Sequence, residues 1–185
     1  ICVTVMNCRA TEPVRERVKF SHPDTVSFAF GGYMHFNMPV GINYARWSPF
    51  ACYGAALEFP SFTPGLFIHT GINAGSIIPV SPDIPRQVNL NFELDMRYEI
   101  ALSPIVIVKP FFGLVSMMVC PQSQFRLDYL LIIRSESEFG LHGGIQTVLK
   151  IRKFTLSLPV TFSSIFSSPT PFLFISISLN AGIQF

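Results

Sequence analysis

The residues best suited to chemistry in this 185-residue sequence are charged side chains that recur at every second position. They form two groups: Glu93, Asp95, Arg97 and Glu99, and then Arg126, Asp128 and Arg134. In an extended chain, every second side chain lies on the same face. Opposite charges on such faces either pair into a network that fills an enclosed space or, if water enters, set the selectivity of a narrow path. The spacing therefore predicts a charge network around a common interior.

Catalysis and metal binding have less support. The four histidines are His22, His35, His69 and His142. Of these His142 is expected to face the same interior, and the pattern leaves this orientation open for His35 and His69. A nucleophilic enzyme needs a nucleophile and a base within reach of each other, and no motif such as G-x-S-x-G accompanies these histidines. They also lack the spacing of metal ligands, and the glycine pairs at 31 and 143 lie within expected strands rather than in phosphate-binding loops. We predict no enzymatic activity, no metal and no cofactor.

The charged residues must be positioned by β-strands, because apolar residues fill the alternate positions. In the segment 88–102 the apolar set is Val88, Leu90, Phe92, Leu94, Met96, Tyr98, Ile100 and Leu102. The segments 139–151 and 154–162 alternate in the same way, but the phase flips across Arg152 and Lys153. Such a flip predicts a tight hairpin.

Six further strands are expected. The alternation is clear at 173–185 and at 124–134, and at 26–44 it predicts one long strand or two strands with an unplaced turn. The remaining strands are 50–59, 66–78 and 104–119, the last being apolar on both faces. Several reach about ten residues, the length that a tilted strand needs to cross a bilayer.

The composition indicates that apolar surface faces something other than water. Hydrophobic residues make up 49% of the chain and charged residues only 13%, and the mean hydropathy is +0.44. The net charge of +2 is small and the basic residues are scattered, so no nucleic-acid footprint is present. A helical membrane protein is disfavoured because Pro159, Pro169 and Pro171 interrupt the long uncharged stretch at 154–185.

These observations predict an all-β protein, a closed antiparallel transmembrane β-barrel of eight to ten strands with short connections. The chain divides into an N-terminal segment, 1–13, and a single barrel domain, 14–185. Closure is expected because every strand edge inside a bilayer must be paired. A soluble, lipocalin-like ligand-binding barrel is the alternative that the alternation leaves open.

The last strand resembles the C-terminal signature of small bacterial outer-membrane β-barrel proteins, of the size class of OmpX, the OmpA membrane domain and OmpW. These proteins end in Phe with apolar residues at every second position upstream, here Phe185, Ile183, Ala181, Leu179 and Ile177. The resemblance implies a location in the bacterial outer membrane, with the lipid bilayer as the main partner. It also implies insertion by the barrel-assembly machinery, which would read Leu179, Ala181, Ile183 and Phe185 as an assembly signal.

Three functions remain open for such a barrel. It is a structural barrel with a filled lumen, a narrow passive pore with a charged lumen, or a membrane-embedded subunit or scaffold of a larger envelope complex. The apolar segment 104–119 suits contacts with other envelope proteins in the third case. The connections are too short to favour surface adhesion.

Overall fold

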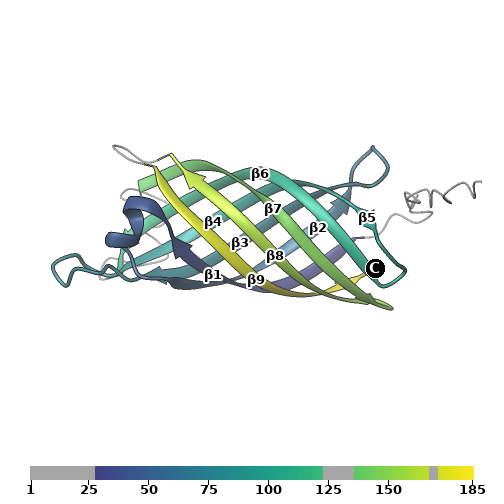
Figure 1. Cartoon of the computed structure of the whole chain (residues 1–185), viewed down its shortest axis with the longest axis horizontal. Helices are drawn as coiled ribbons and strands as arrows, with labels where there is room; N and C mark the ends of the chain where they lie inside the picture. The colour runs from purple at the N-terminus through teal and green to yellow at the C-terminus, as the bar shows by residue number, and fades with distance from the viewer. Residues whose placement is uncertain (1–27, 123–135, 167–170) are drawn as a thin grey trace, which may run out of the picture.

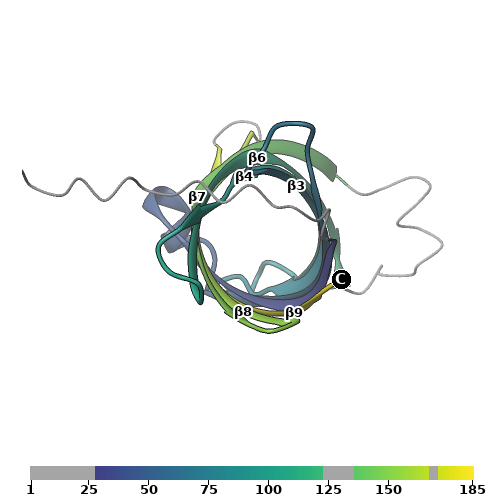
Figure 2. The ribbon, with the colours of Figure 1, turned by 90° about the vertical axis from the view of Figure 1, so that its right-hand side faces the viewer.

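The computed structural model describes residues 28–122, 136–166 and 171–185. Figure 1 shows one barrel of tilted strands, and the view along its long axis in Figure 2 shows that the strands form a closed ring. The strands of the ring are β1 (Ala29–Pro39), β2 (Phe50–Pro60), β3 (Leu66–Ile77), β4 (Gln87–Tyr98), β6 (Val106–Pro121), β7 (Glu136–Ile151), β8 (Phe154–Ile165) and β9 (Phe172–Gln184). A two-residue strand, β5 (Ile100–Ala101), and a 3-10 helix, η1 (Gly41–Ala45), complete the elements.

All pairings in the ring are antiparallel, and each large strand pairs with the next one along the chain. The ring is closed by the pairing of β1 with β9. Closure leaves no free edge, which is the condition for placing strands in a hydrocarbon layer. The prediction of a closed antiparallel barrel is therefore confirmed, with eight strands in the ring among the described residues.

The alternation of β4 separates its two faces as predicted. Leu94 is 52% exposed on the outer surface, whereas its neighbour Asp95 is 1% exposed and points into the lumen. The outer surface is covered by large apolar side chains from every strand of the ring, among them Phe36, Tyr53, Ile72, Phe92, Phe112, Ile145, Phe162 and Ile177. A soluble ligand-binding barrel would have the opposite arrangement, with apolar side chains inside.

The strand that is apolar on both faces, β6, contributes one face to the outer surface and the other to the lumen. Phe112 and Leu114 lie on the outer surface, like the apolar residues of the other strands. Phe111, Val115 and Met117 are buried in the lumen. The observation that suggested a subunit of a larger complex is therefore explained by the barrel itself.

One predicted strand boundary was wrong. The segment 26–44, expected as one long strand or two, holds a single strand that ends at Pro39, because Gly41 adopts a left-handed backbone (φ +64°) and begins η1. The strand expected over 88–102 is interrupted at Glu99, whose N–H bonds to the carbonyl of Gly65, and it resumes as β5 in the same register against β6. By contrast, Ile151 pairs with Phe154 across a two-residue turn, as the phase flip predicted. The strand predicted at 124–134 lies outside the described residues.

The two ends of the barrel differ in their connections. The end on the right of Figure 1, here called the turn end, holds the start of β1, the end of β9 and the connections 61–65, 99–105 and 152–153. The opposite end, here called the loop end, holds the longer connections 40–49 and 78–86. These two loops pair with each other through Trp47 and Pro79.

In the ranges 28–122, 136–166 and 171–185, no helix has both the length and the hydropathy needed to cross a membrane.

Candidate functional site in the barrel interior

The lumen is divided along its axis into a charged half and an apolar half. The charged half, here called the charged belt, lies towards the turn end and contains His35, Glu58, His69, Glu93, Asp95, Arg97, Glu99, Lys109, His142 and Gln146. The apolar half lies towards the loop end and is described below as the apolar plug. Because inward and outward residues alternate, each strand supplies only a few side chains to either half.

Arg97 joins the charged belt across three strands. Its Nη2 donates to Oδ2 of Asp95 over 2.7 Å, and its Nη1 donates to Oε1 of Gln146 on β7 over 2.8 Å. The same Nη1 lies 3.8 Å from Oε2 of Glu58 on β2. The guanidinium also lies 5.0 Å from the centre of the Phe111 ring. These contacts compensate the cost of burying the charge.

Lys109 forms the second ion-pair centre. Its Nζ contacts a carboxylate oxygen of Glu58 and lies 3.3 Å from Oε2 of Glu99. It also lies 4.4 Å from the centre of the Phe67 ring. Together with Arg97, Lys109 links β2, β4 and β6 through their side chains.

The structure thus brings the first predicted group of charges into one lumen but supplies partners that were not predicted. Glu93, Asp95, Arg97 and Glu99 all line the interior. Their partners Glu58 and Lys109 were missed, although Lys109 is the single charge between residues 100 and 120. Such an isolated charge in an apolar segment is a signal for a buried ion pair. The second predicted group, Arg126, Asp128 and Arg134, lies outside the described residues.

Asp95 is the most enclosed carboxylate of the belt. Nε2 of His142 on β7 contacts its Oδ1, while Arg97 holds Oδ2. His69 on β3 is its direct partner across the β3–β4 pairing, and Gly113 is its partner across the β4–β6 pairing. A Cβ at Gly113 would lie 2.5 Å from Oδ1 of Asp95. Glycine therefore provides the room that the carboxylate occupies.

Glu93 is held by an amide and an imidazole. Nδ2 of Asn73 donates to its Oε1 over 2.7 Å, and Nε2 of His35 lies 3.7 Å from the same oxygen. The other ring nitrogen of His35 contacts the hydroxyl of Ser178. Asn73 in turn accepts from Nδ2 of Asn91 over 2.7 Å, which fixes the position of its amide.

The side chains of Ser178, His35 and Glu93 contact one another in the order of a nucleophile, a base and an orienting carboxylate. A working nucleophile must be reachable by a substrate. Ser178 is only 1% exposed and lines neither of the two cavities described below. The hydroxyl therefore positions His35, and the arrangement gives no support for hydrolysis.

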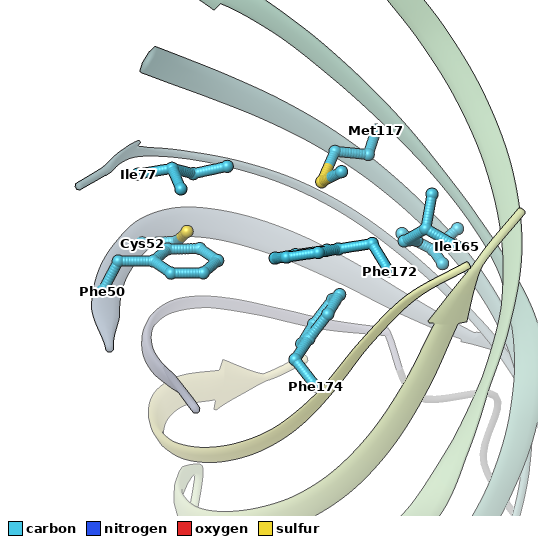
Figure 3. Packing of buried hydrophobic residues seen from close by; sticks show 8 residues of the cluster. Phe50, Cys52, Ile77, Met117, Ile165, Phe172 and Phe174 are labelled. Atoms are coloured by element: carbon cyan, nitrogen blue, oxygen red, sulfur yellow. The ribbon is translucent and has the colours of Figure 1, made fainter. Parts of the chain in front are cut away.

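The apolar plug fills the lumen towards the loop end (Figure 3). It consists of Phe50, Cys52, Ile77, Val115, Met117, Ile165, Phe172 and Phe174, with Trp47 and Val119 packed against it. Phe172 and Phe174 point from β9 towards Phe50, with ring centres 5.5 Å apart from each other and 6.5 Å between Phe50 and Phe174. Trp47 packs edge-on against Phe172 at 6.4 Å. Beside the plug, Asn37 and Asn89 donate to Sγ of Cys52, so these amides are satisfied within the lumen. The plug thus places buried apolar side chains where a pore would need water.

Two cavities lie in the polar part of the lumen. The larger, of about 80 Å³, lies at the turn end and is lined by Glu58, Arg97, Glu99 and Lys109 among others. The smaller, of about 20 Å³, lies between the charged belt and the plug and is lined by Glu93, Asp95 and Phe174 among others. At roughly 10–15 Å³ per water, the first holds several waters and the second holds one or two.

The predicted assembly residues occupy the outer surface of β9. Leu179, Ile183 and Phe185 are exposed there and alternate with the lumen-facing residues of the same strand. Ala181 keeps the same phase and pairs with Gly32 of β1. Their apolar side chains are thus available outside the barrel, where a partner or lipid would meet them.

No protein-family model and no curated protein matches the chain. Solved structures of bacterial outer-membrane proteins are similar to it in fold. The outer membrane protein OprG from Pseudomonas aeruginosa matches with a TM-score of 0.59 at 8% identity, over 86% of this chain and 96% of that one. The Neisserial surface protein A matches at 0.54 and 12% identity (85% and 95%), and the attachment invasion locus protein Ail of Yersinia pestis at 0.53 and 10% (86% and 97%).

At these identities the likeness concerns the fold. The fold is that of small bacterial outer-membrane β-barrels, which confirms the predicted resemblance to this class in fold. The signature of the last strand stays a prediction. The structures named above all come from outer-membrane or surface proteins, in agreement with the predicted location.

Proposed function

We propose that the chain is an integral outer-membrane β-barrel with a closed lumen, a structural barrel rather than a passive pore. The outer surface supports the membrane location, because large apolar side chains cover it on all eight strands of the ring. Apolar patches larger than a few hundred Å² are rare on soluble monomers. Lipid is therefore the partner that this surface fits.

The single observation that carries the closed state is the apolar plug. Phe50, Phe172 and Phe174 meet across the lumen towards the loop end, and the ion pairs of Arg97 and Lys109 cross it towards the turn end. A conducting path needs continuous water, and an apolar constriction excludes it by dewetting. The lumen of an eight-stranded barrel is also only wide enough for side chains.

The connections support an orientation for this barrel. In outer-membrane barrels the short turns face the periplasm and the longer loops face the outside. The turn end, with the two-residue turn 152–153, is thereby assigned to the periplasm, and η1 and the loop 78–86 to the cell exterior. The proposed location further implies export through the periplasm and insertion by the barrel-assembly machinery. Leu179, Ala181, Ile183 and Phe185 are the residues that we assign to recognition by that machinery.

Conductance in planar lipid bilayers tests the proposal. The full chain, folded in detergent and reconstituted, is expected to give no discrete current steps across a range of voltages and salt concentrations. A known porin reconstituted in the same way serves as the positive control. Sustained, reproducible steps from the unaltered chain would show a water-filled path and overturn the closed state.

A further inference from the structure

The charged belt contains more negative than positive charge. It holds four carboxylates and two permanently cationic side chains, Arg97 and Lys109. Arg97 contacts Asp95 and Glu58, and Lys109 contacts Glu58 and Glu99. No ion pair in the described part of the chain joins Glu93 to a lysine or an arginine. A carboxylate away from bulk water without a cation is costly. Glu93 has only the amide of Asn73 and the imidazole of His35 beside it, so it is the carboxylate of the belt with the least positive charge nearby.

A buried histidine without a partner lies beside this carboxylate. His69 is 5% exposed. Neither of its ring nitrogens has a hydrogen bond or an ion pair within residues 28–122, 136–166 and 171–185. Buried polar groups are normally hydrogen-bonded. Because His69 lines both lumen cavities, its imidazole is open to a group held there.

His69, Glu93 and Asp95 converge on one point. The β3–β4 register sets His69 directly opposite Asp95, and Glu93 precedes Asp95 by two residues on the same face. One ring nitrogen of His69 and one carboxylate oxygen from each of Glu93 and Asp95 all lie within 4.8 Å of one another. In a tetrahedral zinc site with bonds near 2.1 Å the ligand atoms are about 3.5 Å apart. Small side-chain rotations would bring the three ligand atoms to this separation.

We propose that His69, Glu93 and Asp95 bind one divalent transition-metal ion in the lumen. One imidazole and two carboxylates form a mixed nitrogen and oxygen set, which suits Zn²⁺, Co²⁺ or Mn²⁺. Ca²⁺ and Mg²⁺ take oxygen ligands almost exclusively and are disfavoured by the imidazole. The ion supplies the positive charge that Glu93 lacks and the partner that His69 lacks.

The residues around the three ligands orient them. Asn73 donates to Oε1 of Glu93 and leaves the other oxygen of that carboxylate for the ion. His142 and Arg97 hold Asp95 from the sides of β7 and β4. Such outer contacts fix ligand orientation and tune affinity in known metal sites. Arg97 also has Glu58 as a second carboxylate at 3.8 Å, so it keeps an anionic partner when Asp95 turns to the ion.

The cavities provide an entry path from the turn end. His69 lines both the larger cavity at the turn end and the smaller cavity beside the plug. The ion would pass the rim of the belt and stop at His69, because the apolar plug closes the lumen beyond it. The smaller cavity has room for a water, which completes the coordination.

Cobalt binding tests the site. The full chain, without an affinity tag, is folded in detergent, treated with a chelator and dialysed before titration with Co²⁺. We expect one Co²⁺ per chain, visible d–d absorption bands, and displacement by Zn²⁺ but not by excess Ca²⁺. His69→Ala and Glu93→Gln are each expected to weaken binding by at least about tenfold. Glu99→Gln, the same change at a belt carboxylate outside the site, should leave the affinity within about twofold.

The heat-dependent gel mobility of each variant shows whether the barrel has formed, and His69→Gln replaces His69→Ala if the latter does not fold. Absence of stoichiometric Co²⁺ binding by the unaltered chain would overturn the proposal. Binding that survives both ligand substitutions would also overturn it, since the ion would then sit elsewhere, for example on the cysteines. Either failure leaves the closed barrel untouched, because the plug does not depend on the metal.

Discussion

The guanidinium of Arg97 lies 2.7 Å from the carboxylate of Asp95, although the two residues stand two positions apart on the same strand. Both side chains are buried in the lumen, where a broken pair leaves an uncompensated charge. The pair also reaches β2 and β7 through Glu58 and Gln146. Loss of the Arg97 charge is therefore expected to lower the stability of the barrel strongly.

Reversing that charge should destabilise the barrel. Arg97→Glu would place a carboxylate beside Asp95 and Glu58, and we expect a loss of about 3–5 kcal/mol in the free energy of unfolding. Urea unfolding in lipid vesicles, followed by the fluorescence of Trp47, the only tryptophan, measures it. Arg46→Glu on the exposed loop 40–49 is the matched control and should change stability by less than about 1 kcal/mol. Equal stability of the two variants would show that the belt is not packed as described.

A side chain at Gly113 should be costly because β4 packs closely against this position. In Gly113→Ala the new Cβ would meet the backbone carbonyl oxygen of Leu94 and would lie 2.5 Å from Oδ1 of Asp95, so the backbone of β4 and the ion pair of Asp95 must shift. Overpacking of this kind costs about 1–3 kcal/mol. Gly32→Ala is the control, since the nearest atom to its Cβ is a carbonyl oxygen at 3.7 Å. The same urea titration compares them, and a neutral Gly113→Ala would contradict the close approach.

The outer surface should reject charge near the middle of the barrel wall. Leu94→Arg puts a cation on the lipid-facing side of β4, where such a change costs about 2–4 kcal/mol in a bilayer. Leu102→Arg, in the exposed connection at the turn end, should cost no more than about 1 kcal/mol. Folding yield and stability in vesicles measure both. If Leu94→Arg were neutral there, that face would be in contact with water rather than lipid.

Removing the aromatic part of the plug should open the lumen partly. The double variant Phe172→Ala and Phe174→Ala deletes two rings that meet Phe50, and water can then reach the charged belt from the loop end. We expect small current steps in planar bilayers, with a preference for cations because the belt holds four carboxylates against two cations. Phe112→Ala and Phe162→Ala together, on the outer surface, are the matched control and should remain silent. If the plug variant folds but gives no current steps, the charged belt rather than the plug closes the lumen.

The sequence predicted the strands and their faces well because alternation is a local property. The phase of residues 139–162 located the hairpin at Arg152, and the row from Glu93 to Glu99 was placed inside. The partners of that row could not be predicted, because pairing register decides them. Glu58, like Lys109, is an isolated charge in an apolar segment, which indicates burial but not its partner. The partners of Glu58 and the position of His69 are set only when β2 and β3 are aligned on β4. For the same reason, the spacing of the histidines gave no hint that His69 stands opposite Asp95.

Boundaries were predicted less well where backbone geometry outweighs the pattern. Val40, Ile42 and Tyr44 continue the even phase of β1, yet Gly41 turns the chain into η1. The phase of β4 continues through Ile100 in β5, but the hydrogen bond from Glu99 to Gly65 interrupts the strand between them. Hydrophobic periodicity cannot report either event, since it carries no information on φ or on hydrogen-bond partners.

The pairing of β1 with β9 has a kinetic consequence. Every other seam of the ring joins strands that are close along the chain, whereas this one joins Ala29 to Gln184 and ends with the N–H of Phe185 bonded to Phe28. The search for so distant a contact is slow, since more than 150 residues must be ordered or looped first. Until this pairing forms, β1 and β9 each have an unpaired edge that can pair with another chain. A helper protein that holds the last strand would therefore act on the step that limits maturation, whatever the barrel does afterwards.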